Sequence, residues 1–183
     1  MDIQTAYQYA IRFAALKHAE NAQMIRDSNV PYLAHVCNVA MEILIAGPLT
    51  PSFDTAFAVQ VALLHDTLED TTASIVEVTD TFGVDIAAAV EALTKNEELP
   101  HEAQMPDTID RIKKNRKEVW AVKLADRITN LQAPPVSWTT EKLGAYYEES
   151  IMILESLKGG NAYLEERLAQ KIEAYKTYLP SFW

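Results

Sequence analysis

The sequence is poor in cysteine and has no long apolar run, and both absences limit where the protein can work. Only one cysteine, Cys37, occurs among the 183 residues, so no intrachain disulfide can form. No apolar run approaches the roughly 20 residues that a membrane-spanning helix needs. The start of the chain, MDIQTAYQYAIRFA, lacks the basic beginning and small-residue cleavage site of a secretory signal. We therefore expect a cytoplasmic protein without a membrane partner.

Positive charge is also scarce. The chain has 16 Lys and Arg against 26 Asp and Glu, which gives a net charge of −10. This balance argues against a general nucleic-acid binder, because such binding depends on many cationic contacts to phosphate. One segment differs: RIKKNRK, residues 111–117, places five cations in seven positions. It is either a solvated helix face or a local attractor for an anionic small molecule.

Glycine is rare, with 5 residues in the whole chain, and stretches rich in Ala, Leu, Glu and Lys favour helices. No segment shows the sustained alternation of a half-buried strand. We predict an all-α fold, a single compact multi-helix domain over residues 1–183, with Asp54, Thr72 and Thr139 as possible helix caps. The segment 97–107, which contains two prolines, is predicted to be a mobile loop. Helices are expected over residues 3–22, 31–46, 53–69, 73–81, 84–95, 108–132, 139–157 and 161–177.

The stretch VALLHDTLEDTT, residues 61–72, sets an apolar run directly against His65, Asp66, Glu69 and Asp70. On one continuous helix these four side chains point into one sector, because residues four apart share a stripe. Uncompensated carboxylates there would cost several kcal/mol each or would take up protons. Either the helix ends in solvent, which explains Glu69 and Asp70 well, or a cation is bound, which also explains His65 and Asp66.

A bound metal ion needs further ligands, and two candidates lie in other helices. His35 falls in an apolar helical frame, where a lone histidine is commonly a hydrogen-bonded core residue. Asp126 falls in a second apolar frame and could simply pair with Lys123 or Arg127. Two imidazoles and two carboxylates together suit Mn²⁺, Fe²⁺ or Zn²⁺, with positions left for water and substrate. The candidate ligand set is His35, His65, Asp66 and Asp126.

This ligand pattern resembles that of the HD superfamily of metal-dependent phosphohydrolases. RDSNVPYLAH, ALLHDTLEDT and VKLADRITNL are similar to the motifs of the alarmone hydrolases of the RelA/SpoT family. The resemblance runs from about residue 5 to residue 158, and it is greatest to the small stand-alone hydrolases, including the metazoan type. It implies hydrolysis of the 3′-diphosphate of ppGpp or pppGpp, a small anionic nucleotide, to GDP or GTP and pyrophosphate.

The resemblance also implies residue roles. The four candidate ligands would hold one Mn²⁺, and Glu69 and Asp70 would position a water molecule and handle its proton. Arg26 and Ser28 would approach the guanine base, Asn130 would contact the nucleotide, and Tyr146 would lie on the substrate side. Lys123, Arg127 and the 111–117 segment are the candidate partners of the phosphates.

The chain departs from the family pattern next to Arg26, where Asp27 replaces a basic residue and Asn29 replaces glycine. A negative charge there could weaken guanine nucleotide binding, so two other hypotheses about the function stay open. One is an HD phosphohydrolase acting on another nucleotide, such as NADPH or a nucleoside monophosphate. Another is a catalytically silent HD module that binds a nucleotide as a sensor.

Several aromatic and histidine side chains fall outside the motifs. Trp120, Trp138 and Trp183 are expected to pack in the fold rather than to stack on a base. His18 is expected on a helix surface and His101 in the mobile loop, and neither is given a role.

Overall fold

The structure, a computed structural model, describes residues 1–180, so Trp183 lies outside the described residues. Within residues 1–180 the only extended pairing is an isolated bridge between Met24 and Pro31. The prediction of an all-α fold is therefore confirmed. The elements are α1 (Ile3–Glu20), α2 (Leu33–Ala46), the 3₁₀ turn η1 (Gly47–Leu49), α3 (Thr55–Leu64), α4 (Thr67–Asp70), α5 (Ile75–Phe82), α6 (Val84–Leu93), α7 (His101–Lys113), α8 (Lys117–Asn130), α9 (Thr140–Ser156), α10 (Ala162–Tyr175) and the 3₁₀ turn η2 (Lys176–Tyr178).

Two helices, α3 and α8, form the centre of the fold. The α3 sequence, TAFAVQVALL, is apolar almost all round, as expected for a helix enclosed on every side. It packs against α1, α2, α6 and α8, and α8 packs in turn against α2 and α10. Residues Val119 to Ile128 of α8 are buried apart from Trp120, and they include Lys123, Asp126 and Arg127. Charged side chains on such a central helix require partners or a ligand.

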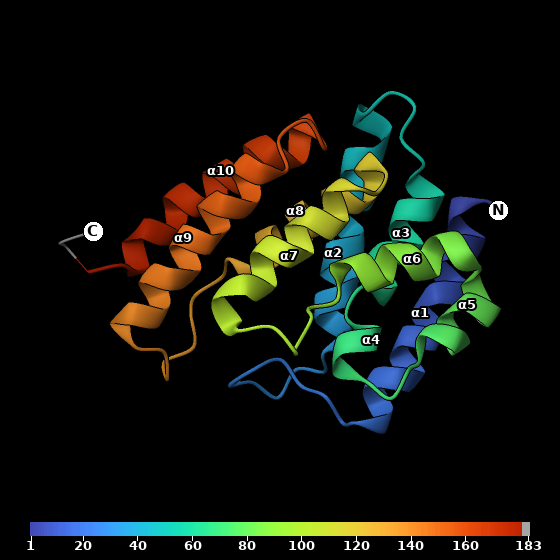
Figure 1. The fold of residues 1–183 in the computed structure, drawn as a ribbon, viewed down its shortest axis with the longest axis horizontal. Coiled ribbons are helices and arrows are strands. Elements are labelled where there is room, and N and C mark those ends of the chain that lie inside the picture. The colour runs from blue at the N-terminus through green and yellow to red at the C-terminus, as the bar shows by residue number, and fades with distance from the viewer. Residues whose placement is uncertain (181–183) are drawn as a thin grey trace.

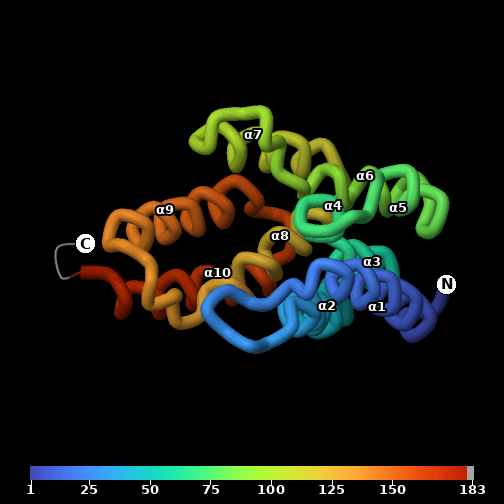
Figure 2. Tube along the Cα trace, turned by 90° about the horizontal axis from the view of Figure 1, so that it is seen from below, coloured from blue at the N-terminus to red at the C-terminus, as the bar shows by residue number. Residues whose placement is uncertain are grey.

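The remaining helices surround this centre. Figure 1 shows α9 and α10 side by side at the C-terminal end of the molecule, with the N-terminus at the opposite end. In Figure 2 the segment from α4 to α7 lies along one side, α1 and α2 lie along the other, and α8 runs between them. The loop between α1 and α2 reaches the loop that follows α8, since Ser137 Oγ donates a 2.9 Å hydrogen bond to the Asp27 carboxylate. No helix within residues 1–180 is long and apolar enough to span a bilayer.

Two of the expected caps are present. Asp54 accepts a hydrogen bond from Phe57 N at the start of α3, and Thr139 accepts one from Lys142 N at the start of α9. Thr72 is not a cap: its hydroxyl donates to Glu20, and Ser74 caps α5 instead. Short polar side chains lie so close together at residues 71–74 that the sequence alone did not identify the capping residue.

Three boundary predictions were wrong. The helix expected over 53–69 ends at Leu64 and restarts as α4, and the one expected over 108–132 is interrupted between α7 and α8. The expected loop 97–107 is helical from His101, so His101 begins α7 rather than lying in a loop. The apolar spacing of Met105, Ile109 and Ile112, all buried, outweighs Pro106 inside the helix.

Candidate metal centre

The break between α3 and α4 gives the HD pair its geometry. Because α3 ends at Leu64, His65 and Asp66 lie in a turn rather than on one continuous helix. The Nδ1 atom of His65 is 2.8 Å from the carbonyl oxygen of Ala62 and donates its proton there, which leaves Nε2 facing the carboxylates, where its lone pair can bind a metal ion once Nε2 is deprotonated. This hydrogen bond is the type of outer contact that orients a metal-ligating imidazole.

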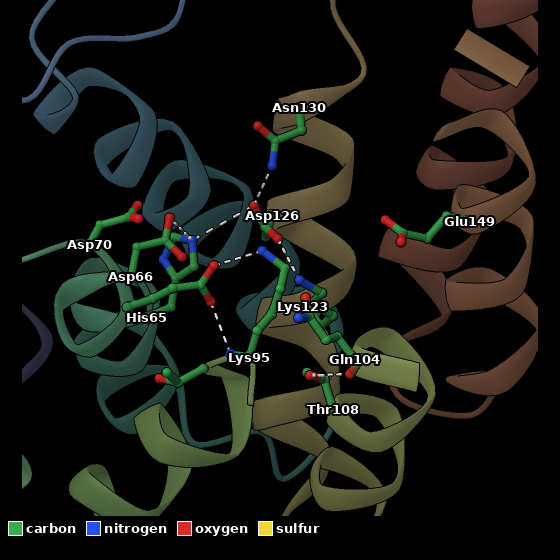
Figure 3. Close-up of polar contacts among 12 residues, drawn as sticks. His65, Asp66, Asp70, Lys95, Gln104, Thr108, Lys123, Asp126, Asn130 and Glu149 are labelled. Carbon is green, nitrogen blue, oxygen red and sulfur yellow. Dashed lines mark hydrogen bonds and ion pairs between the residues drawn. The ribbon is translucent and has the colours of Figure 1, made fainter. Parts of the chain in front are cut away.

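The four candidate ligands converge from three parts of the chain. Asp126 Oδ1 lies 3.3 Å from His35 Nε2 and 3.7 Å from His65 Nε2. Asp66 Oδ2 lies 3.0 Å from His65 Nε2 and 3.7 Å from His35 Nε2. In Figure 3, His65 and Asp66 face Asp126 across a short gap, with Asn130 and Lys123 on either side of Asp126 along α8. Ligands about 2.1 Å from one ion are about 3 Å apart, so these separations suit a shared divalent cation.

The hydrogen-bond pattern also fits an ion. The Nε2 atoms of His35 and His65 are buried and have no hydrogen-bond partner within the described residues. His35, His65 and Asp126 offer ligand atoms that lie within 4.8 Å of one another. Lys123 Nζ binds Asp126 through the other oxygen, Oδ2, at 3.0 Å. The ion pair between Lys123 and Asp126, expected as the alternative to a metal ion, is therefore present. It leaves the other carboxylate oxygen, Oδ1, directed at the imidazoles.

Electrostatics at the cluster favour ionised carboxylates. Burial acts to raise the pKa of Asp126, but Lys123 and the two imidazoles hold it well below its usual range. Burial likewise opposes ionisation of Asp66, and His65 outweighs it, so the pKa of Asp66 is also lowered. The pKa of His65 is raised well above its ordinary value because Asp66 and Asp126 outweigh its burial. Lys123 and His65 thus oppose the negative charge of the two carboxylates in the metal-free protein, and a divalent cation can take over that role.

Glu69 and Asp70 lie beside the cluster, and each is held by a side chain that lies outside the sequence motifs. Lys95 donates to Glu69 from both its backbone nitrogen, at 3.0 Å, and its Nζ, at 2.6 Å. Gln23 Nε2 donates to Asp70 Oδ2 at 3.0 Å. Burial and the nearby Asp66 raise the pKa of Asp70. Both carboxylates therefore have hydrogen-bond partners within the protein. This differs from the alternative in which the helix ends in solvent and water alone contacts them.

Two cavities meet at the cluster. The smaller, of about 270 Å³, is lined by Asp66, Glu69, Asp70 and Asp126 together with cationic side chains. The larger, of about 510 Å³, is lined by His35 and by the loops that follow α1 and α8. Three residues border both cavities: Tyr32, Asn130 and Tyr146. These two neighbouring cavities, together called the cleft below, give the site an acidic end beside the cluster and an aromatic end.

The four expected substrate contacts do not all reach the cleft. Arg26 lines the larger cavity, and Asn130 lines both cavities while donating to Asp126 Oδ1 at 2.6 Å. Tyr146 also lines both, and its burial raises the pKa of its phenol to about 12. Ser28 is not among the lining residues: its hydroxyl bonds the Ile25 carbonyl at 2.8 Å and so shapes the loop.

Of the expected phosphate partners, Lys123 and Arg127 line the smaller cavity. Arg127 stacks on the Tyr146 ring with its guanidinium carbon 4.2 Å from the centroid, and it donates to Glu149 and Ser150. The 111–117 segment lies elsewhere. Its Arg111 donates to the carbonyl oxygens of Glu91 and Thr94, at 2.6 and 2.7 Å, and so caps α6.

Four further residues belong to the cleft. Lys95 and Glu149 line the smaller cavity, and neither lies in a recognisable motif. Tyr32 lies within RDSNVPYLAH, three residues before His35, and its hydroxyl donates to Asp66. Burial, followed by Asp66, raises the pKa of Tyr32 far above its ordinary value, so it acts as a donor. Trp138, expected to be a packing residue, lines the larger cavity beside Tyr146, whereas Trp120 packs against the core.

The fold and the site together define an all-helical domain with a buried His/Asp group that can hold a divalent ion. The family model described as the HD domain matches residues 10–157. The chain therefore belongs to the HD-domain family.

Similar proteins include curated guanosine-3′,5′-bis(diphosphate) 3′-pyrophosphohydrolases. The one from Danio rerio is 30% identical over 164 residues, covering 87% of this chain and 88% of the relative. The one from Homo sapiens is 30% identical over 163 residues, with 87% and 88% covered. Among solved structures, a metazoan orthologue of SpoT described as hydrolysing ppGpp matches with a TM-score of 0.78 and 28% identity, covering 92% of this chain and 94% of that one.

Proposed function

We propose that this chain is a divalent-metal-dependent guanosine-3′,5′-bis(diphosphate) 3′-pyrophosphohydrolase that converts ppGpp or pppGpp to GDP or GTP and pyrophosphate. One observation carries the proposal: two unpartnered imidazole nitrogens and two carboxylates converge where an acidic cavity meets an aromatic one. The relatives that share about 30% identity over most of the chain carry this activity in their names. The HD-domain match supports the same class, a phosphohydrolase.

His35, His65, Asp66 and Asp126 would hold the ion. Two imidazoles and two carboxylates suit Mn²⁺, with Fe²⁺ and Zn²⁺ as the alternatives. When bound, the ion supplies an acidified water and polarises phosphoryl oxygens. Asn130 and Lys123 bind Asp126 from its two oxygens and fix the direction in which its carboxylate faces.

Glu69 and Asp70 are the proton-handling groups of the proposal. Water attacks the phosphorus attached to the 3′ oxygen, the bond between phosphorus and that oxygen breaks, and the oxygen gains a proton as pyrophosphate leaves. A carboxylate beside the attacking water accepts the water's proton. Lys95 holds Glu69 by two hydrogen bonds, and Gln23 holds Asp70 by one, so both carboxylates have defined orientations before substrate arrives.

The rest of the cleft matches the two ends of the nucleotide. Lys95, Lys123 and Arg127 line the smaller cavity and offer positive charge to the diphosphate. The larger cavity, at about 510 Å³, lies within the usual size of small-molecule sites, and Trp138 and Tyr146 give it aromatic walls for a base. Arg26 at its edge offers hydrogen-bond donors.

Asp27, the departure from the family pattern, has a structural role that is compatible with the proposal. Its carboxylate accepts from Ser137 Oγ and is not among the groups that line the larger cavity. The negative charge therefore joins the two loops that border the base region instead of facing the base. A guanine nucleotide remains the favoured substrate.

The experiment is a substrate screen of the purified, Mn²⁺-loaded chain. Pyrophosphate release from ppGpp is expected, with loss of activity in EDTA and in Asp126→Asn. NADPH and deoxynucleoside monophosphates are the competing substrates, and faster turnover of either would replace the proposed one. Binding of ppGpp without turnover would favour a silent sensor.

We also propose that residues 1–183 form one domain, and the cytoplasmic location stays a prediction.

A further inference from the structure

The geometry points to His18 as a positioning residue that acts through Gln23 on the orientation of the Asp70 carboxylate. This inference rests on the proposed function, because Asp70 is one of its two proton-handling groups. Both His18 and Gln23 lie outside the three motifs, before RDSNVPYLAH in the sequence.

His18 is buried, which contradicts the expectation that it lies on a helix surface. It is in the last turn of α1 and only 3% exposed. Helix α1 packs against α4, the short helix that carries Glu69 and Asp70. A buried imidazole needs a hydrogen-bond partner, and His18 has one through a single nitrogen.

That partner fixes the position of the imidazole proton. His18 Nδ1 lies 2.6 Å from Gln23 Oε1, and Nε2 has no partner within the described residues. An amide oxygen can only accept, so Nδ1 must carry the proton and donate it. This arrangement corresponds to the form of His18 that carries its proton on Nδ1.

The same contact fixes the orientation of the Gln23 amide. With Oε1 occupied by His18, the amide nitrogen is directed at Asp70 and donates to Oδ2 at 3.0 Å. The flipped amide would place Oε1 against the carboxylate, which two acceptors disfavour. His18 therefore reinforces the orientation in which Asp70 meets a donor rather than an acceptor. Figure 3 places Asp70 on the same side of the cluster as Asp66, its neighbour one turn earlier.

A second contact joins His18 to the same region. Its ring centroid lies 5.1 Å from that of Tyr32, and Tyr32 lies 5.1 Å from His35. Tyr32 donates to Asp66, a candidate metal ligand. His18 thus packs against Tyr32, which holds Asp66, and forms a hydrogen bond with Gln23, which holds Asp70.

The test compares two replacements of His18. In His18→Leu the donor is lost, and kcat for ppGpp is expected to fall by about 10- to 100-fold, with KM within about twofold. In His18→Asn the side-chain amide can place a donor near the Nδ1 position, and most of kcat is expected to return. The matched control is Asn21→Ala, because Asn21 donates to the backbone oxygen of Asp70 and not to its carboxylate. It is expected to leave kcat within about twofold.

Gln23→Met supplies the second variant, which stays informative if His18→Leu does not fold. It removes the amide, so its kcat is expected to fall by about 10- to 100-fold, as in His18→Leu. Adding His18→Leu to Gln23→Met should cause no further loss, because both changes disrupt the same chain of contacts. Independent losses, an unchanged kcat in Gln23→Met, or a His18→Asn variant as slow as His18→Leu would overturn the inference.

A measurement without substrate separates this inference from the proposed function. The ¹⁵N spectrum of the imidazoles is expected to show His18 as the Nδ1–H tautomer in the wild type, and as a mixture in Gln23→Met. If the wild type shows that tautomer but does not cleave ppGpp, only the proposed function fails. If His18 is a mixture of tautomers in the wild type, the positioning role fails whatever the substrate is.

Discussion

Lys123 offers a direct way to distinguish a metal site from a self-contained ion pair. Its Nζ lies 3.0 Å from Asp126 Oδ2, and both side chains are only 9% exposed. Breaking a buried ion pair by removing one partner costs about 3 kcal/mol or more. Lys123→Met is therefore expected to lower the stability of the metal-free protein by about 3 kcal/mol. For a chain of this size, that corresponds to a fall in Tm of about 6–12 °C.

A divalent ion changes this result if it occupies the cluster. In Lys123→Met, a bound Mn²⁺ ion would balance the charge of Asp126 in place of the lysine. The ion would also avoid the repulsion that the Lys123 ammonium group exerts in the wild type. The rise in Tm caused by Mn²⁺ is thus expected to be larger in Lys123→Met than in the wild type. Activity is expected to fall in the same variant, because the smaller cavity loses a cation that faces the diphosphate.

Differential scanning calorimetry in EDTA and in excess Mn²⁺ measures both quantities. Lys17→Met is the matched control, since Lys17 Nζ forms a 2.9 Å ion pair with Glu77 away from the cleft. That variant should show the wild-type response to Mn²⁺. An equal Tm loss of Lys123→Met with and without Mn²⁺ would refute the reasoning, because it would mean that Lys123 serves the fold alone.

The remaining predictions concern single side chains of the site. His65→Ala should bind less than a tenth of the wild-type Mn²⁺ in equilibrium dialysis; full metal content would contradict its assignment as a ligand. Glu69→Gln should keep its metal but lose about 10²- to 10⁴-fold in kcat, the usual contribution of proton transfer; pyrophosphate release at wild-type rate would exclude it. Asp27→Ala and Ser137→Ala should each raise KM for ppGpp several-fold with kcat unchanged, since both remove one contact between loops; unchanged KM in both would mean that the contact is irrelevant.

The fold class and the candidate ligand set could be predicted because they depend on local residue patterns. His35, His65, Asp66 and Asp126 each stand in an apolar frame where such groups are costly, and that cost is visible in the sequence. The break between α3 and α4 was not visible, because VALLHDTLED has helical spacing throughout and no Gly or Pro at the break. A break of this kind depends on tertiary context, which overrides local helix propensity.

Residues that enter the cleft from distant segments were harder to predict. Lys95 reaches Glu69 from the loop after α6, and Glu149 comes from the far helix α9, and neither follows a motif. The prediction for His18 was wrong in the opposite direction: it was expected on a helix surface, whereas it is buried and bonded to Gln23 in the turn that follows α1. Such contacts depend on how the helices are arranged, which local sequence patterns do not specify.

The most direct test is the anomalous diffraction of a crystal of the Mn²⁺-loaded protein. The account predicts one strong peak within about 2.4 Å of the Nε2 atoms of His35 and His65 and of a carboxylate oxygen from each of Asp66 and Asp126. A strong peak elsewhere, or Mn²⁺-bound protein whose four side chains contact only one another and Lys123, would contradict it.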